Sequence, residues 1–218
     1  MPITNTRALP AFLAVGSIAL LSACGGENAD DAPEEGGTTV VEHAFGETEI
    51  PENPERIATV QWSNHEVPLA LGVVPVGMAA ANFGDEDGDG LLPWVEDRLE
   101  ELDAEAPVLF DETDGIDFEA VADTEPDVIL AGYSGLTQED YDTLSEIAPV
   151  VAYPETAWGT TWRESIEINS AGMGMAEEGE ELIADIEAEI EEIASAHPEL
   201  EAPPPCSSPM WTPQTCPR

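Results

Sequence analysis

The sequence predicts an α/β protein: a Rossmann-like sandwich lobe with a central, mostly parallel sheet, followed by one long helix. Short apolar runs recur along the chain, helical patterns separate them, and the last helical pattern is the longest. The apolar runs are continuous rather than alternating, which is typical of strands buried on both faces of a parallel sheet. Alternation of such strands with helices favours right-handed crossovers within one sandwich.

The first regular elements are a predicted β-hairpin, with strands at 39–44 and 47–50 joined by a turn at Phe45-Gly46. Pro51 and Pro54 follow it and end the pairing. The buried strands are then predicted at 57–60, 73–78, 107–110, 127–131 and 149–152. The helices between and after them are predicted at 64–71, 92–102, 118–123, 138–147 and 162–173.

The last helix, predicted at 177–196, has an apolar stripe on an otherwise acidic surface. Leu182, Ile186, Ile190 and Ile193 share one side of it, with Ile183 beside them. The domain boundaries follow from these patterns, with an α/β ligand-binding lobe at 38–174 and a long linker helix at 175–198.

The start of the chain predicts an exported lipoprotein. Residues 1–23 combine Arg7, an apolar run too short to span a membrane, and small residues before Cys24. We interpret them as a signal peptide, and Cys24 as the site of lipidation that holds the chain at the extracytoplasmic face of the cell membrane. Residues 24–37 are acidic and poor in large apolar side chains, as expected of a disordered tether. The alternative is an ordinary secretory signal with an incidental cysteine.

The charge of the chain is extreme. The 218 residues carry 47 Asp and Glu against 5 basic residues, a formal net charge of −42, and there is no lysine. Nucleic acid and anionic lipid would be repelled, so the composition excludes them as partners. Because salt screens such self-repulsion, we hypothesise a halophilic origin; the alternative is simply an acidic exported protein.

Aromatic and hydroxyl residues follow several of the predicted strands. In open α/β sheets, ligands bind beyond the carboxyl ends of the strands, and Trp and Tyr supply rigid, partly polar walls. Arg163 would pair with an anionic ligand. The predicted ligand-binding residues are Trp62, Ser63, Asn64, Tyr133, Ser134, Trp158, Trp162 and Arg163.

Several motifs between about residues 40 and 200 resemble the iron-siderophore substrate-binding lipoproteins of bacterial ABC importers, which bind ferric hydroxamates or catecholates. They include Glu42-His43-Ala44-Phe45-Gly46, Asp117-Phe118-Glu119-Ala120, Glu125-Pro126-Asp127-Val128, Tyr133-Ser134-Gly135-Leu136 and Ile147-Ala148-Pro149. The resemblance implies two α/β lobes joined by a long helix, with a ferric siderophore bound between them before docking on the permease subunits. This chain supplies the first lobe and the helix.

The same resemblance implies a role for one acidic residue and leaves the ligand open. An acidic side chain on the first lobe pairs with an Arg of the permease in this family, and the match falls on Glu119. Similar folds bind haem or a corrinoid, and the sequence does not separate these ligands.

An acidic loop carries a separate hypothesis. Counted from Asp85, acids at positions 1, 3, 5 and 12 with Gly at 6 match the spacing of an EF-hand calcium loop. Pro93 and the lack of a long preceding helix speak against it. The predicted calcium ligands are Asp85, Asp87, Asp89, Leu91 and Glu96. A calcium-binding surface or adhesion lipoprotein is therefore the alternative from another functional class.

Catalytic motifs are not apparent. The histidines at 43, 65 and 197 are scattered, and Ser134 does not lie in a Gly-x-Ser-x-Gly elbow. We therefore expect a binding protein and not an enzyme.

The end of the chain changes composition abruptly. Residues 202–218 lack Asp and Glu and are rich in Pro, with both remaining cysteines. Codons can be chosen so that the neighbouring frame at 202–213 encodes a plausible strand, so we hypothesise a frameshift or truncation within 199–218. Loss of a second lobe would impair ligand binding and leave the apolar stripe of the last helix uncovered. The alternative is a Pro-rich tail closed by a Cys206–Cys216 disulfide.

Overall fold

The structure, a computed structural model, describes residues 39–85 and 87–198. The predicted signal peptide, the lipidation site at Cys24, the tether at 24–37 and the tail at 199–218 lie outside the described residues.

The described chain opens with the predicted β-hairpin. Strand β1 (Thr39–His43) pairs antiparallel with β2 (Gly46–Ile50), and His43 lies opposite Gly46 at the turn. Gly46 has a φ of +128°, which a side chain at this position would strain. Val41 and Ile50 are buried, whereas the alternate residues of both strands are mostly exposed. The hairpin thus has one face on the core and one in solvent.

The central sheet is parallel throughout. It consists of β3 (Ile57–Thr59), β4 (Gly77–Ala79), β5 (Val108–Phe110), β6 (Val128–Ala131) and β7 (Val150–Ala152). Their order in the sheet is β5-β4-β3-β6-β7, and every neighbouring pair is parallel. The chain builds outward from β3 in one direction and then returns to build outward from β6 in the other. The α/β fold class and the mostly parallel sheet are confirmed, with a topological switch point between β3 and β6.

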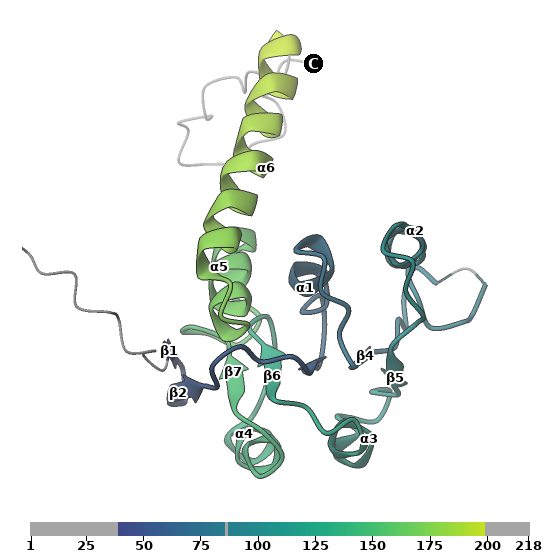
Figure 1. Ribbon diagram of the computed structural model, residues 1–218, viewed down its shortest axis with the longest axis vertical. Coiled ribbons are helices and arrows are strands. Elements are labelled where there is room, and N and C mark those ends of the chain that lie inside the picture. Colours follow the sequence, from purple (N-terminus) through teal and green to yellow (C-terminus); the bar gives the residue numbers. More distant parts are fainter. Residues whose placement is uncertain (1–38, 86, 199–218) are drawn as a thin grey trace, which may run out of the picture. The chain divides into compact units, whose positions relative to one another are not determined.

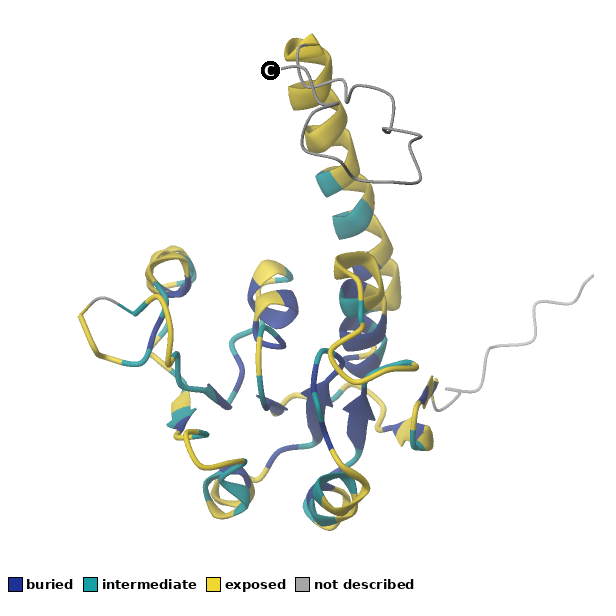
Figure 2. Ribbon diagram, turned by 180° about the vertical axis from the view of Figure 1, so that it is seen from behind, coloured by how far each residue is buried: buried dark blue, intermediate teal, exposed yellow. Residues whose placement is uncertain are grey.

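Helices cover both faces of this sheet (Figure 1). Three lie on one face: α1 (Glu66–Ala70), α2 (Pro93–Glu101) and α5 (Trp162–Gly172). The opposite face carries α3 (Phe118–Asp123) and α4 (Gln138–Ser145). Burial is concentrated on the strands and on the inner faces of these helices (Figure 2), where Phe110 and Ile129 pack toward α3 and α4 and Leu130 packs with Ile168 of α5.

One predicted strand is wrong over most of its length. The apolar run at 73–78 begins in a turn, where the Val73 amide donates to the carbonyl of Pro68 at 2.8 Å. Pro75 has no amide hydrogen to offer a neighbouring strand. The first hydrogen bonds to the neighbouring strands are those of Val76, to Ile57 and Val108, and strand β4 itself begins at Gly77, where an added Cβ would lie 2.2 Å from the Phe110 ring.

The long last helix is α6 (Ala176–Ala196), which begins just after α5. Only its first part packs: Gly179 is buried against Ser170 of α5, whose Oγ would be 2.1 Å from an added Cβ. Ile190 and Ile193, by contrast, are 52% and 51% exposed. Leu182, Ile183 and Ile186 are half-buried, so the expected apolar stripe on α6 is uncovered only in its later part. None of the described helices combines the length and apolar character needed to cross a membrane.

Candidate functional site

A pocket of about 230 Å³ lies where the loops after β3, β4, β5 and β7 meet α1. Gln61, Trp62 and Ser63 come from the first of these loops, Glu112 follows β5, and Trp158 follows β7. All of these loops leave the carboxyl ends of parallel strands, so they meet at one edge of the sheet beside its switch point. Trp62 and Trp158 remain 42% and 49% exposed, which leaves their indoles available to a ligand.

The backbone around this pocket is held in an uncommon conformation. Gln61, Ser63 and Trp158 have φ angles of 59°, 64° and 59°, in the left-handed region that residues other than glycine rarely adopt. Such residues cost of order 1–3 kcal/mol each and persist where surrounding contacts fix them, which is typical of binding sites. Helix α1 begins at Glu66 rather than at the predicted residue 64, because Asn64 and His65 form a turn in which the Glu66 amide donates to the Ser63 carbonyl at 3.0 Å.

Asn64 joins the loops on either side of the switch point. Its Nδ2 donates to the carbonyls of Val60 at 2.8 Å and Tyr133 at 2.9 Å, and its Oδ1 accepts from the Tyr133 amide at 2.8 Å. Asn169 of α5 adds a longer contact to the same Oδ1, at 3.3 Å. The Asn64 side chain is fully buried and so offers no surface to a ligand in this conformation. Its role here is to position Ser63 and Tyr133.

Gln61 makes a second set of bridges. Its backbone amide donates to both carboxylate oxygens of Glu112, at 3.1 and 3.0 Å. Its side-chain Oε1 accepts from the amide of Gly135 at 2.7 Å. One residue after β3 thereby connects the loops after β5 and β6.

The Trp158 indole packs directly on the loop after β6. The Trp158 amide donates to the Ser134 carbonyl at 2.8 Å, and the indole meets the Tyr133 ring edge-on with centroids 5.3 Å apart. A Cβ added to Gly135 would lie 2.2 Å from the indole Nε1. This approach requires glycine at 135. Ser134 is fully buried and, like Asn64, presents no surface to a ligand here.

Three titratable residues of the pocket, His65, Glu66 and Glu112, were not predicted from the sequence. Burial raises the pKa of Glu66. Burial raises the pKa of Glu112 to about 7, against which the Gln61 amide acts to lower it. Burial lowers the pKa of His65 to about 4. His65 stacks on Trp94 with centroids 5.6 Å apart, and neither of its ring nitrogens has a hydrogen-bond partner among the described residues. Only the sheet order brings these residues together, so no local sequence signal indicates them.

A second, more apolar groove of about 580 Å³ lies between α1, α5 and α6. Tyr133, Trp162, Leu182 and Ile186 line it, and it shares Ser63 and Glu66 with the first pocket. Five of the eight predicted binding residues line these two adjoining hollows: Trp62 and Trp158 the first, Tyr133 and Trp162 the second, and Ser63 both, whereas Asn64, Ser134 and Arg163 line neither.

Arg163 lines neither hollow, and its guanidinium is paired within the chain. Its Nε donates to Glu187 Oε1 of α6 at 2.6 Å, and its guanidinium lies 4.2 Å from the centroid of Trp162. The expected pairing with an anionic ligand therefore has a competitor within the chain, and Arg163 instead connects α5 to α6.

Glu119 lies away from both hollows. It is exposed in the first turn of α3, a helix capped by the Asp117 carboxylate, which accepts from the Ala120 amide at 3.0 Å. An exposed carboxylate on a capped helix is accessible to another protein, and its predicted role in docking stays a prediction.

The acidic loop brings three of its predicted calcium ligands together. Single carboxylate oxygens of Asp85, Asp87 and Asp89 lie within 4.8 Å of one another. Backbone amides of Gly88 and Gly90 donate to Asp85 and lower its pKa, whereas the neighbouring Asp85 raises the pKa of Asp87. Glu96 is not in that cluster, and the loop follows strand β4 rather than a helix. The helix–loop–helix arrangement of an EF-hand is therefore absent from the described residues.

Converging post-strand loops with exposed aromatics and a fixed backbone define a ligand-binding protein of the α/β type with helices on both faces of its sheet. The chain belongs to the Periplasmic binding protein family, which it matches over residues 57–207. That family is one of binding proteins.

Individual relatives agree with this assignment. The chain is 29% identical over 185 residues to the "Probable siderophore-binding lipoprotein YfiY" of Bacillus subtilis (strain 168), covering 84% of this chain and 53% of that protein. It superposes on PiaA of Streptococcus pneumoniae TIGR4 in complex with ferrichrome with a TM-score of 0.71 and 53% identity, covering 74% of this chain and 53% of PiaA. A periplasmic solute binding protein of Mycobacterium smegmatis matches with a TM-score of 0.67 and 30% identity, over 75% of this chain and 56% of that one. The chain therefore spans about half the length of these relatives.

Proposed function

We propose that this chain is the first lobe and linker helix of a substrate-binding lipoprotein that captures a ferric siderophore for uptake by an ABC importer. The observation that carries the proposal is the pocket at the switch point, where Trp62 and Trp158 stand exposed on loops of fixed backbone. The relatives support it, since one is named for siderophore binding and another was solved with ferrichrome.

The pocket suits a compact chelate with both apolar and polar surface. Flat indoles contact the apolar parts of such a ligand, while Ser63 and Glu112 offer polar contacts. In the adjoining groove, Tyr133 and Trp162 extend this wall toward α6. The ligand-contacting residues of the proposal are Trp62, Ser63, Tyr133, Trp158 and Trp162.

Cys24 and Glu119 would have distinct roles in such a protein. A lipid on Cys24 would keep the lobe beside its permease at the extracytoplasmic face of the membrane, and the acidic tether would give it reach. Glu119, on the opposite face of the sheet from α1, would pair with an Arg of the permease.

Tryptophan fluorescence during titration with ferric chelates tests the proposal. Binding should quench the emission, and Trp158→Phe should remove much of the quenching because its indole borders the pocket. Trp94→Phe is the matched control, since Trp94 stacks on His65 outside the pocket lining. Free tryptophan corrects for absorption by the chelate. If no ferric chelate quenches beyond that correction while haem or cobalamin does, the ligand is haem or a corrinoid instead.

A calcium-binding surface or adhesion lipoprotein is the second candidate, favoured by the convergence of Asp85, Asp87 and Asp89. Carboxylates this close repel one another and would be stabilised by a divalent cation. Calorimetry with Ca²⁺ should then show binding that Asp85→Ala removes and that Glu105→Ala, outside the loop, retains. Absence of heat with the unaltered chain would leave the loop as an acidic turn.

A further inference from the structure

The pocket is lined by acidic side chains but by no arginine or lysine among the described residues. The acidic residues are Glu66 and Glu112. The sequence has no lysine at all. His65 does not supply a positive charge near neutral pH, because burial lowers its pKa to about 4. The part of the site formed by this chain therefore presents negative or neutral groups to a ligand.

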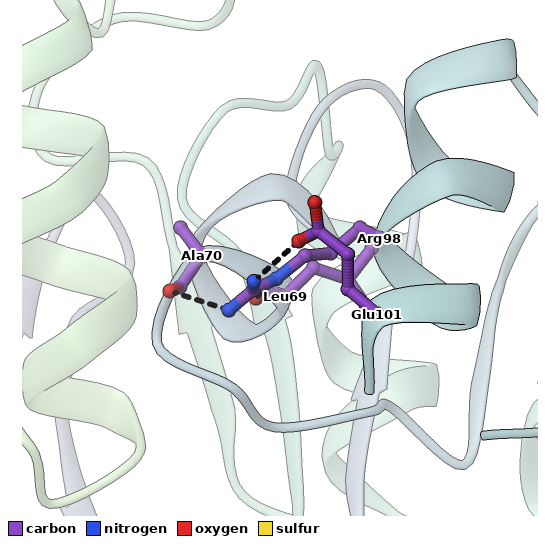
Figure 3. A network of polar contacts seen from close by, with 4 residues as sticks. All are labelled: Leu69, Ala70, Arg98 and Glu101. Atoms are coloured by element: carbon purple, nitrogen blue, oxygen red, sulfur yellow. Dashed lines mark hydrogen bonds and ion pairs between the residues drawn. The ribbon is translucent and has the colours of Figure 1, made fainter. Parts of the chain in front are cut away.

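The arginines of the described chain make hydrogen bonds and ion pairs away from the pocket. Arg98 donates to the carbonyl of Leu69 at 2.9 Å and to that of Ala70 at 3.4 Å, and it pairs with Glu101 at 2.9 Å (Figure 3). It thereby fixes the end of α1 to α2. Arg56 donates to the carbonyls of Thr124 and Glu125, and Arg163 pairs with Glu187. None of the three lines the pocket.

The Glu112 carboxyl is fixed in place rather than free to swing away. Both of its oxygens accept from the Gln61 amide, whose own φ of 59° is held by the further bond from Gly135 to the Gln61 side chain. A ligand entering the pocket therefore meets this group at a set position.

We propose that this pocket selects ferric chelates without net negative charge, the class formed by three hydroxamates, and rejects the strongly anionic class formed by three catecholates. This inference rests on the proposed function and narrows its ligand. Three singly charged hydroxamates neutralise Fe³⁺, whereas three doubly charged catecholates leave a trianion. A trianion would lose its hydration beside Glu112 without gaining a cation from this lobe.

The salt concentration distinguishes the effect of the pocket charge on ligand binding from the effect of the overall charge. The overall charge of −42 repels any anion, but exposed charges are screened over about 3 Å at 1 M salt. Glu112 is partly buried, and charges in such positions are screened much less. Selection that originates in the pocket should thus persist at about 1 M NaCl, whereas general repulsion should disappear.

The full chain is titrated at about pH 8, where Glu112 with its pKa of about 7 is ionised, with ferrichrome as the neutral trishydroxamate and with ferric enterobactin as the anionic tricatecholate, in about 0.1 and 1 M NaCl. We expect ferrichrome to bind tighter by roughly tenfold or more at both salt concentrations. Equal or tighter binding of ferric enterobactin, or a preference that vanishes at the higher salt concentration, would overturn the charge selection and leave siderophore capture intact. If neither chelate binds, the proposed function fails, and the selection fails with it.

Substitution of Glu112 tests whether this residue causes the selection between the two chelates. Glu112→Gln removes the charge but keeps an oxygen to accept from the Gln61 amide, so binding of ferric enterobactin should strengthen severalfold relative to ferrichrome. Glu139→Gln is the charge-matched control, because Glu139 is exposed on α4 across the sheet from the pocket. It should leave the ratio of the two affinities unchanged. An unchanged ratio in Glu112→Gln as well would contradict the assignment.

Discussion

Asn64 and Tyr133, 69 residues apart in the sequence, exchange two hydrogen bonds: the Asn64 Nδ2 donates to the Tyr133 carbonyl at 2.9 Å, and the Tyr133 amide donates to the Asn64 Oδ1 at 2.8 Å. A side-chain amide here substitutes for a neighbouring strand and pairs the backbone just beyond β6. The two loops of the switch point are thereby fixed relative to each other.

Replacing Asn64 by Ala should destabilise the lobe by about 2–4 kcal/mol, because buried amide and carbonyl groups of Val60 and Tyr133 lose their partner. Urea unfolding monitored by circular dichroism measures this change. Gln138→Ala removes an exposed amide that bonds only to Asp142, and it should change stability by no more than about 0.5 kcal/mol. Similar values for both variants would show that Asn64 does not hold the loops.

Glu112 should make stability fall as the pH rises. Its pKa in the folded chain is raised by burial to about 7 from its usual value of 4.5, so the folded state binds more protons between these values. The stability that the protonated carboxyl provides is complete below pH 4.5 and is lost as the pH passes about 7. Since the group is partly exposed, we expect an effect on the order of 1 kcal/mol. Glu112→Gln, compared with the unaltered chain by urea unfolding from pH 4.5 to 8, should lack this loss; parallel curves would contradict the prediction.

His65 should act in the opposite direction. Its pKa is lowered from 6.5 to about 4, so the unfolded state binds more protons between these values and stability falls on acidification. The loss is on the order of 3 kcal/mol when complete. His65→Phe preserves a ring to stack on Trp94 and removes the titration, so this variant should resist acid better between pH 6.5 and 4. Urea unfolding across this pH range measures the effect; parallel stability curves for His65→Phe and the unaltered chain would contradict the prediction.

The fold was more predictable than the site. Continuous apolar runs identified β3, β5, β6 and β7 to within a residue or two, because burial on both faces of a sheet leaves that pattern locally. The prediction of a strand at 73–78 was wrong because apolar composition alone does not reveal the turn after α1, which the bond from the Val73 amide to the Pro68 carbonyl closes. Aromatic residues such as Trp62 and Trp158 were also identified by local sequence, since each follows a strand.

The remaining features of the site depend on contacts between distant residues. Nothing near Glu112 in the sequence shows that the Gln61 amide will bond to it, 51 residues away. Asn64 was expected at the ligand and is buried instead, because its bonds to Tyr133 exist only once β3 and β6 lie side by side. Arg163 finds its partner Glu187 on a helix that begins after a turn whose geometry the sequence does not reveal.

Gly135→Ala should weaken ligand binding through Trp158 without a large loss of stability. The added methyl would overlap the indole, whose Nε1 lies 2.2 Å from the Cβ position, and would push it off the loop. We expect at least roughly fivefold weaker binding of a ferric chelate, a loss of about 1 kcal/mol. Fluorescence titration measures it. In Trp158→Ala the methyl has nothing to displace, so adding Gly135→Ala to that variant should cost little more; an additive loss would indicate another cause.

The left-handed residues at Gln61, Ser63 and Trp158 all bond through their main chains, so the path of the pocket loops depends on these backbone groups as well as on the Glu112 carboxylate that accepts from Gln61. The Trp158 amide would still donate to Ser134 if the indole were exchanged for another ring. The main-chain position of residue 158 thus does not depend on which ring its side chain carries. Such a lobe suits engineering as a sensor, in which an environment-sensitive fluorophore replaces an exposed indole while the loops keep their form.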